Sequence, residues 1–143
     1  MSSSLLAEKF DILHATSAAC VVMTDGMSAV AVLRLRAMLQ AARFSVILCD
    51  TAKAALAACR REGVTLLVTS GTEQGRRLLA WMRQGDESGV EQGAAVTRIA
   101  LLAEEEGPEA VLEMLMAGAN ECLVWPFGEQ MLAQRLRMVM QAA

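Results

Sequence analysis

The residue types that most often carry chemistry are sparse in this sequence and are not spaced for a metal site. The cysteines at 20, 49, 59 and 122 form no CxxC pair, and His14 is the only histidine. A structural zinc site needs about four such ligands at characteristic spacings. We therefore predict no metal site and interpret the cysteines as buried free thiols, since free cysteine behaves as a small hydrophobic side chain.

A second set of candidate residues follows short apolar runs whose composition predicts strands. In an open sheet of parallel strands, ligands bind beyond the carboxyl ends of the strands. No glycine-rich phosphate loop and no acid placed for a ribose accompany these positions, which disfavours a nucleotide. We expect a pocket there lined by Thr24, Asp25, Ser70 and Ala103.

The elements that would position these side chains alternate along the chain. Apolar runs rich in β-branched residues predict strands, and periodic apolar residues between them predict helices. The alternation indicates an α/β fold whose mainly parallel sheet is covered by helices on both faces. We predict strands over 20–23, 45–49, 64–69, 98–102 and 121–124, and helices over 28–42, 51–62, 74–83, 108–117 and from 128 to the end.

The predicted element boundaries depend on capping residues. Ser28 and Thr51 are typical N-caps, and Gly63 and Gly118 stand where helices are expected to end. The segment 84–96, QGDESGVEQGAAV, lacks periodicity and is rich in glycine, so we predict a long surface loop there.

The overall composition excludes several classes of function. The 143 residues are 55% hydrophobic and carry a net charge of −3, which does not favour nucleic acid as a partner. No apolar run approaches the roughly 20 residues of a membrane span, and we expect a cytoplasmic protein. Residues 1–18 precede the alternating pattern as an N-terminal extension. Its Leu5, Leu6, Phe10 and Leu13 are spaced for an amphipathic helix, either a frayed leader or an interface helix.

The C-terminal third carries a family resemblance. The segment AEEEGPEAVLEMLMAGANECLVWPF resembles the end of the receiver domain of bacterial response regulators, with Gly118, Ala119, Pro126 and Phe127 as matching positions. The similarity extends over about residues 19–143, which we interpret as one receiver-like domain. The resemblance implies a flavodoxin-like doubly wound (βα)5 sheet with strand order 2-1-3-4-5, and a cis peptide bond before Pro126.

Receiver domains accept a phosphoryl group from a histidine kinase, and the resemblance identifies the positions that this reaction needs. Asp25 is the one acid left after the first strand, and the position of the acceptor carboxylate falls on Ser70, or on Thr69 if the register shifts by one. Ala103 replaces the hydroxyl, Trp125 the lysine and Cys122 the aromatic residue. A neutral serine without a base is a poor acceptor. We therefore predict a degenerate pocket without catalytic residues or cofactor.

Trp125 admits two interpretations. Its ring could fill the disused pocket, which we favour because large aromatic side chains are mostly buried. Alternatively it is exposed and belongs to a docking surface, since tryptophan is enriched at binding hot spots.

Two helices carry more apolar residues than one buried stripe requires. They are the helix over 108–117 and the final helix, and with the fifth strand they form the face that receiver domains use for dimers and effectors. Methionines suit such an adaptable surface. The interface candidates are Leu112, Met114, Met116, Cys122, Met131, Arg135 and Met138.

These observations predict a phosphorylation-independent interaction module that binds itself, as a homodimer, or another protein. Such pseudo-receivers can be the N-terminal regulatory or localisation domain of a larger protein, for example a ParA/MinD-like ATPase of pilus assembly, and we expect that arrangement here. The alternatives are a small-molecule-sensing domain and residual phosphotransfer onto Asp25 or Ser70.

Overall fold

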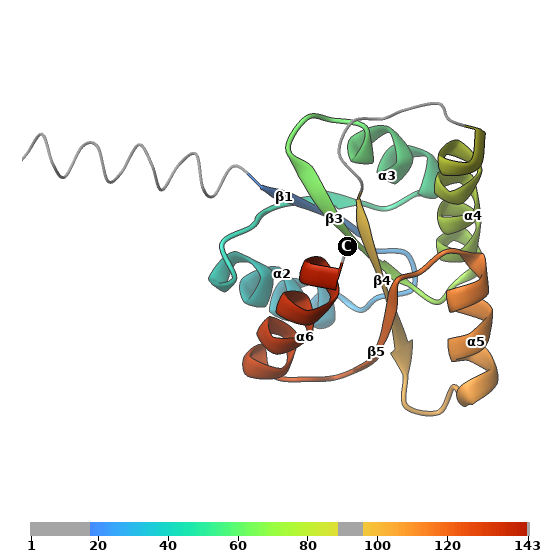
Figure 1. The fold of residues 1–143 in the computed structure, drawn as a ribbon. Helices are drawn as coiled ribbons and strands as arrows, with labels where there is room; N and C mark the ends of the chain where they lie inside the picture. Colours follow the sequence, from blue (N-terminus) through green and yellow to red (C-terminus); the bar gives the residue numbers. More distant parts are fainter. Residues whose placement is uncertain (1–17, 89–95, 143) are drawn as a thin grey trace, which may run out of the picture.

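The computed structural model describes residues 18–88 and 96–142, which form one five-stranded parallel sheet with helices on both faces (Figure 1). The strand order is β2-β1-β3-β4-β5, as the family resemblance implies. Residues 1–17 of the N-terminal extension lie outside the described part of the chain. They include Leu5, Leu6, Phe10 and Leu13. In chain order the elements are β1 Ala19–Met23, α2 Ala29–Ala41, β2 Ser45–Cys49, α3 Ala52–Cys59, β3 Val64–Ser70, α4 Glu73–Ser88, β4 Thr97–Ala103, α5 Pro108–Ala117, β5 Glu121–Trp125 and α6 Glu129–Ala142.

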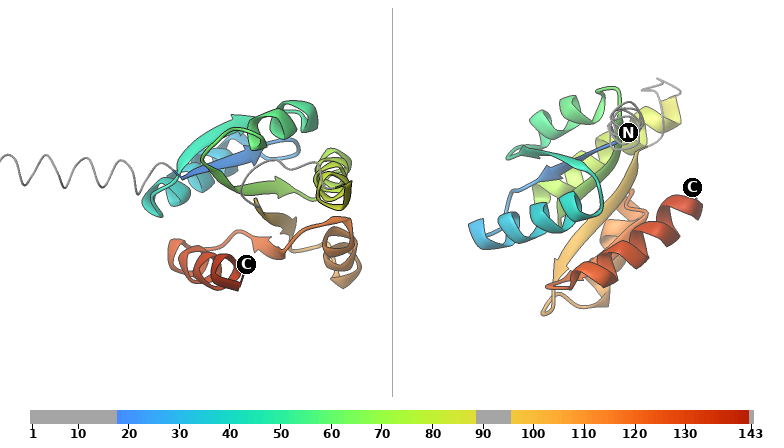
Figure 2. Two further views of the ribbon diagram at one scale, coloured as in Figure 1. Left: turned by 45° about the horizontal axis from the view of Figure 1, so that its top comes forward. Right: turned by 90° about the vertical axis from the view of Figure 1, so that its left-hand side faces the viewer.

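Two apolar clusters, one on each face of the sheet, hold the layers together. Helices α3, α4 and α5 cover one face, where Leu78, Leu79 and Met114 are buried. Helices α2 and α6 cover the other, where Leu39 and Leu132 are buried. The views of Figure 2 show the two helical layers on either side of the strands. Because side chains alternate along a strand, each central strand contributes to both clusters, which explains its continuous apolar sequence.

Two helix boundaries differ from the sequence prediction. Helix α4 continues through Ser88, so the first part of the predicted loop 84–96 is helical. Its last turns are held by Asp86, whose carboxylate lies 2.6 Å from the guanidinium of Arg98, a buried residue of β4. Helix α3 ends at Cys59 rather than at residue 62, and the chain turns before Gly63, which has a positive φ of 91°.

The caps predicted at Ser28, Thr51 and Gly118 form as expected, whereas α3 ends before the predicted Gly63. The Ser28 hydroxyl accepts a hydrogen bond from the Ala31 backbone N–H, and the Thr51 hydroxyl accepts one from Ala54. Helix α5 ends at Gly118, whose φ of 131° suits a residue without a side chain. The loops after β1, β3 and β4 lie at the same edge of the sheet, because the carboxyl ends of parallel strands lie together.

Candidate functional site

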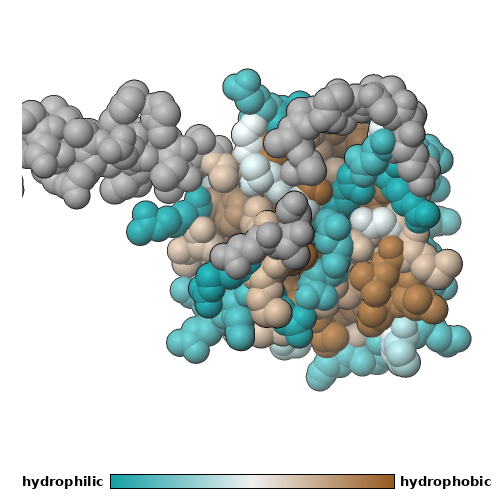
Figure 3. All heavy atoms as spheres, in the orientation of Figure 1, coloured by the Kyte–Doolittle hydropathy of each residue, from teal (hydrophilic) through white to brown (hydrophobic). Residues whose placement is uncertain are grey.

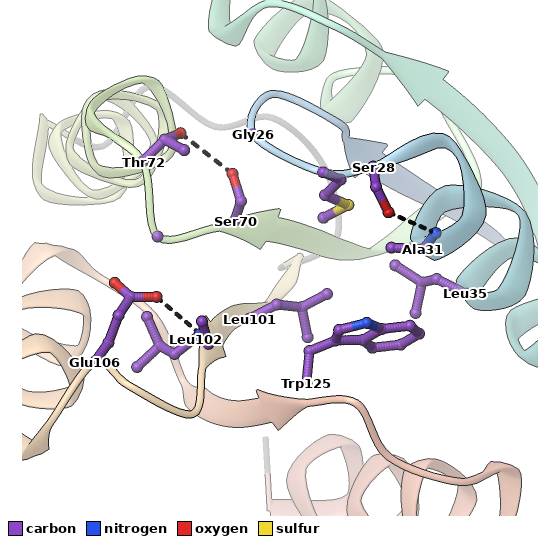
Figure 4. Close-up of a pocket in the computed structure, with 13 residues that line it drawn as sticks. Gly26, Ser28, Ala31, Leu35, Ser70, Thr72, Leu101, Leu102, Glu106 and Trp125 are labelled. Carbon is purple, nitrogen blue, oxygen red and sulfur yellow. Dashed lines mark hydrogen bonds between the residues drawn. The ribbon is translucent and has the colours of Figure 1, made fainter.

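A cavity of about 390 Å³ opens at the carboxyl edge of the sheet. It lies between the loops that follow β1, β3 and β4 and the last residue of β5 (Figure 4). Its size is that of a small-molecule site. The lining residues are Gly26, Met27, Ser28, Ala31, Leu35, Ser70, Gly71, Thr72, Leu101, Leu102, Ala103, Glu106 and Trp125.

The structure brings together three of the five pocket residues expected from the sequence. Ser70, Ala103 and Trp125 line the cavity, whereas Thr24 and Asp25 lie beside it in the loop after β1. The Thr24 hydroxyl donates to the backbone carbonyl of Cys49, 3.2 Å away. Asp25 takes part through its backbone carbonyl, which accepts the hydrogen bond of the Ser70 hydroxyl.

Ser70 is the β3 residue that faces the cavity, and Thr69 is fully buried. The Ser70 oxygen lies 3.2 Å from the hydroxyl oxygen of Thr72. Since a hydroxyl has a single proton and Ser70 gives its own to Asp25, Thr72 is the donor in this pair. The Thr72 oxygen also accepts from the Gly75 N–H at 3.3 Å. The hydroxyls are therefore engaged in fixing the loop after β3.

Trp125 is half-buried and forms one wall of the cavity. Its ring packs edge-to-face against Phe127 at 5.0 Å between centroids, and the Arg34 guanidinium carbon lies 5.9 Å from its centroid. Because open space remains beside the ring, the expectation that Trp125 fills the pocket is wrong. The Trp125–Pro126 peptide bond is cis.

Among the described lining residues, Glu106 alone has an ionisable side chain. Its Oε2 atom accepts a hydrogen bond of 2.8 Å from the Ala103 backbone N–H, which fixes the carboxylate at the cavity wall. Within residues 18–88 and 96–142, no three histidine, cysteine or acidic side chains are grouped so that they could hold a metal ion.

The cysteines lie away from this cavity. Cys20 and Cys59 are buried, whereas Cys49 and Cys122 are partly buried. Burial raises the pKa of Cys59 to about 12 and the pKa of Cys122 to about 11. Burial also raises the pKa of Cys20 and Cys49. The thiols therefore stay protonated at neutral pH, where a thiolate would be needed for nucleophilic chemistry or metal binding.

Sequence reasoning missed most of the cavity wall. Met27, Leu35 and Leu101 belong to its apolar part, and none of them was predicted as a pocket residue. Thr72 also went unnoticed, although a hydroxyl two residues after a strand end is a signal for a residue at that edge. Glu106 belongs to the acidic run 104–106 in the turn after β4.

The predicted interface residues divide into three groups. Leu112, Met116 and Met138 are exposed, and Cys122, Met131 and Arg135 are partly buried. Met114 is buried beneath α5, so its assignment to the interface is wrong. The reason is that Met114 lies on the side of α5 that covers the sheet, where it joins the core cluster.

Comparison with known proteins identifies the architecture. No protein-family model and no curated protein sequence matches the chain. Among solved structures, the receiver domain of the response regulator Ssk1 from Saccharomyces cerevisiae, solved with the phosphotransfer protein Ypd1, is similar with a TM-score of 0.73 and 18% identity over 88% of this chain and 92% of that one.

Two further structures show different contexts of the same fold. A two-component response regulator/GGDEF domain protein aligns with a TM-score of 0.70 and 21% identity over 91% of this chain and 52% of that one. The beryllofluoride-activated NtrC4 receiver domain dimer aligns with a TM-score of 0.68 and 12% identity over 88% and 98%. With its strand order and coverage, this chain has the flavodoxin-like fold of a response-regulator receiver domain.

Proposed function

We propose that the chain is a signalling module that acts without phosphorylation, in other words a pseudo-receiver. The observation that carries the proposal is Ser70, a hydroxyl at the end of β3 where phosphoryl transfer to a receiver needs a carboxylate. The hydroxyl already donates to the Asp25 carbonyl. Among the described residues, the hydrogen-bond partners of Ser70 are the Asp25 backbone carbonyl and the Thr72 hydroxyl, and neither can act as its base.

The rest of the cavity supports the same proposal. Phosphoryl transfer depends on positioning and on neutralising negative charge. Here the lysine position holds Trp125, and the ionisable group at the wall is Glu106, a carboxylate that repels a phosphoryl donor. Magnesium prefers an octahedral shell of oxygen ligands, usually with one or two carboxylates and several waters. Asp25 lies beside the cavity rather than in its lining, so the lining supplies few of the carboxylate ligands that Mg²⁺ needs.

Acetyl phosphate with Mg²⁺ tests this proposal directly. We expect the intact mass of the protein to stay unchanged, because no lining residue combines a nucleophile with a base. A phosphorylation-competent receiver treated in parallel is the positive control. A gain of one phosphate overturns the proposal, and the variants Asp25→Asn and Ser70→Ala then show which side chain carries it.

We further propose that the module docks through the face formed by α5, β5 and α6. Exposed hydrophobic side chains gather there, and Figure 3 shows them over α5 and β5. Arg135 of α6 pairs with Glu121 of β5 at 2.7 Å, which ties the two elements of the face together. The exposed apolar residues of this face are Leu112, Leu115, Met116, Val124 and Met138.

A second copy of the chain is the partner we favour for this face. Scattered apolar residues on a surface need no explanation, but a contiguous patch is typical of an interaction site. The similar NtrC4 receiver domain is described as a dimer, which supports a homodimer as the first arrangement to test.

We also propose that the chain is the regulatory or localisation domain of a longer protein, such as a ParA/MinD-like pilus-assembly ATPase. The support is that the fold occurs as one part of a longer chain in the response regulator/GGDEF domain protein, of which this chain spans 52%. In such an arrangement the α5–β5–α6 face would transmit a docking event to the output domain.

A further inference from the structure

The cavity at the carboxyl edge of the sheet has two chemically different ends (Figure 4). Trp125, Leu35 and Leu101 lie together at one end, near Ser28. Ser70, Thr72 and Glu106 lie at the other end, where the apolar Leu102 lies beside Glu106. A small-molecule site combines these properties: mostly apolar walls and a few polar groups that fix orientation. The question is which ligand chemistry the two ends select together.

The apolar end has a preformed shape. Leu35 and Leu101 are buried in the core cluster on the α2 side of the sheet, so their positions are set by packing. The Trp125 ring is held by Phe127 and Arg34, neither of which lines the cavity. A flat or branched hydrocarbon body can therefore bind there without first ordering the wall, which lowers the cost of binding.

Neither hydroxyl at the polar end has a proton left to donate to a ligand. The Ser70 proton is used on the Asp25 carbonyl, and the Thr72 proton is used on Ser70. Each oxygen retains acceptor capacity, because a hydroxyl has two lone pairs. A ligand group that meets these two side chains must therefore be a hydrogen-bond donor.

The negative charge at the polar end also favours a ligand group that donates hydrogen bonds. Glu106 is anchored through Oε2 by the Ala103 N–H, and an ionised carboxylate only accepts hydrogen bonds. Glu106 and its neighbours Glu104 and Glu105 are exposed residues of one turn, which makes this turn negatively charged. An ammonium group satisfies both conditions, because it is a cation with three donors, whereas a phosphate or carboxylate satisfies neither.

We propose that this cavity binds a small primary amine with an apolar, preferably aromatic, body, its ammonium group paired with Glu106 and its body packed against Trp125. This site is independent of the proposed docking face, because it shares none of that face's exposed residues. It gives the domain an input that needs neither a kinase nor a metal ion.

A series of three probes of equal size and different charge tests the proposal: 2-phenylethylamine, 2-phenylethanol and phenylacetate. Each is titrated to millimolar concentration into the ¹⁵N-labelled protein, and amide shifts are followed at Gly71 and Ala103 with the indole N–H of Trp125. We expect saturable shifts with the amine, weaker binding of the alcohol, and no binding of the acid. Equal binding of amine and acid, absence of amine binding, or shifts confined to other residues overturns the proposal.

Two variants in one turn distinguish a direct pairing with Glu106 from the effect of the protein's net charge. Glu106→Gln keeps an oxygen that can accept from Ala103 but removes the negative charge, and should weaken amine binding roughly two- to fivefold without changing alcohol binding. Glu105→Gln makes the same change in net charge outside the lining and should have a smaller effect. Equal effects of both variants contradict a pairing at Glu106. Thermal unfolding confirms that both variants are folded.

Discussion

Met114 and Met116 are two residues apart on α5 and lie in opposite environments. Met114 is 1% exposed and belongs to the core beneath the helix, whereas Met116 is 64% exposed. Helical geometry explains the difference, because residues two apart point to opposite sides of the helix. The contrast offers a direct test of the orientation of α5.

We expect Met114→Ala to lower the free energy of unfolding by about 2–5 kcal/mol, because it leaves a cavity in a close-packed core. The matched variant Met116→Ala should change it by less than about 0.5 kcal/mol, since the side chain is at the surface. Urea denaturation of both variants measures the difference. Similar losses for the two would mean that α5 is rotated relative to the structure described here.

The chemistry at the candidate site was partly predictable from single residues. The strand ends identified Ser70 and Ala103, because ligands bind beyond the carboxyl ends of parallel strands, and the family resemblance added Trp125. The role of Met114 was not predictable, because apolar residues occupy several sides of the 108–117 helix and leave its buried stripe ambiguous. The two ends of the cavity depend on which side chain contacts which backbone group, and sequence spacing does not contain that information.

The proposed docking face of α5, β5 and α6 leads to a prediction about which helix carries self-association. We expect Met138→Glu to abolish self-association, because it would bury a carboxylate in an apolar contact. The matched control is Leu33→Glu, which makes a comparable change at an exposed apolar residue of α2. Light scattering coupled to gel filtration gives the mass of each variant over a range of concentrations.

Either of two results contradicts this interface. One is a wild-type mass of a single chain at every concentration, which rejects self-association. The other is a loss of mass in Leu33→Glu rather than in Met138→Glu, which would move the contact to α2. Leu112→Glu, on the other helix of the face, should behave as Met138→Glu does if both helices take part.

At the element level the sequence predicted the strands well and two helix ends badly. Apolar runs flanked by breakers define a buried parallel strand, so the five strands were placed to within one or two residues. Helix α4 was predicted too short because glycine-rich sequence after Arg83 indicated a loop. The pairing of Asp86 with Arg98 joins two segments through tertiary structure, and no local pattern reports it.

For the whole molecule, the proposed place in a longer protein has a simple test. An immunoblot of native cell extract with antibodies against this chain should show a band well above 15.3 kDa, the mass of the chain itself. Purified chain provides the size standard, and extract from cells lacking the gene shows which bands are specific. A specific band at the size of the purified chain, with none larger, would contradict the proposal.

The order of the strands also determines how the sheet can assemble during synthesis. Strand β1 is the first of the five strands to leave the ribosome, and its two neighbours β2 and β3 are the next two strands of the chain. Strands β4 and β5 then add in turn to the β3 side. Strand β3 covers the second edge of β1, β4 covers the free edge of β3, and β5 covers the free edge of β4. Unpaired edges of this kind promote aggregation. By the time Ser70 has emerged, both partners of β1 have been synthesised, so a sheet formed by then exposes only the outer edge of β2 and the growing edge of β3.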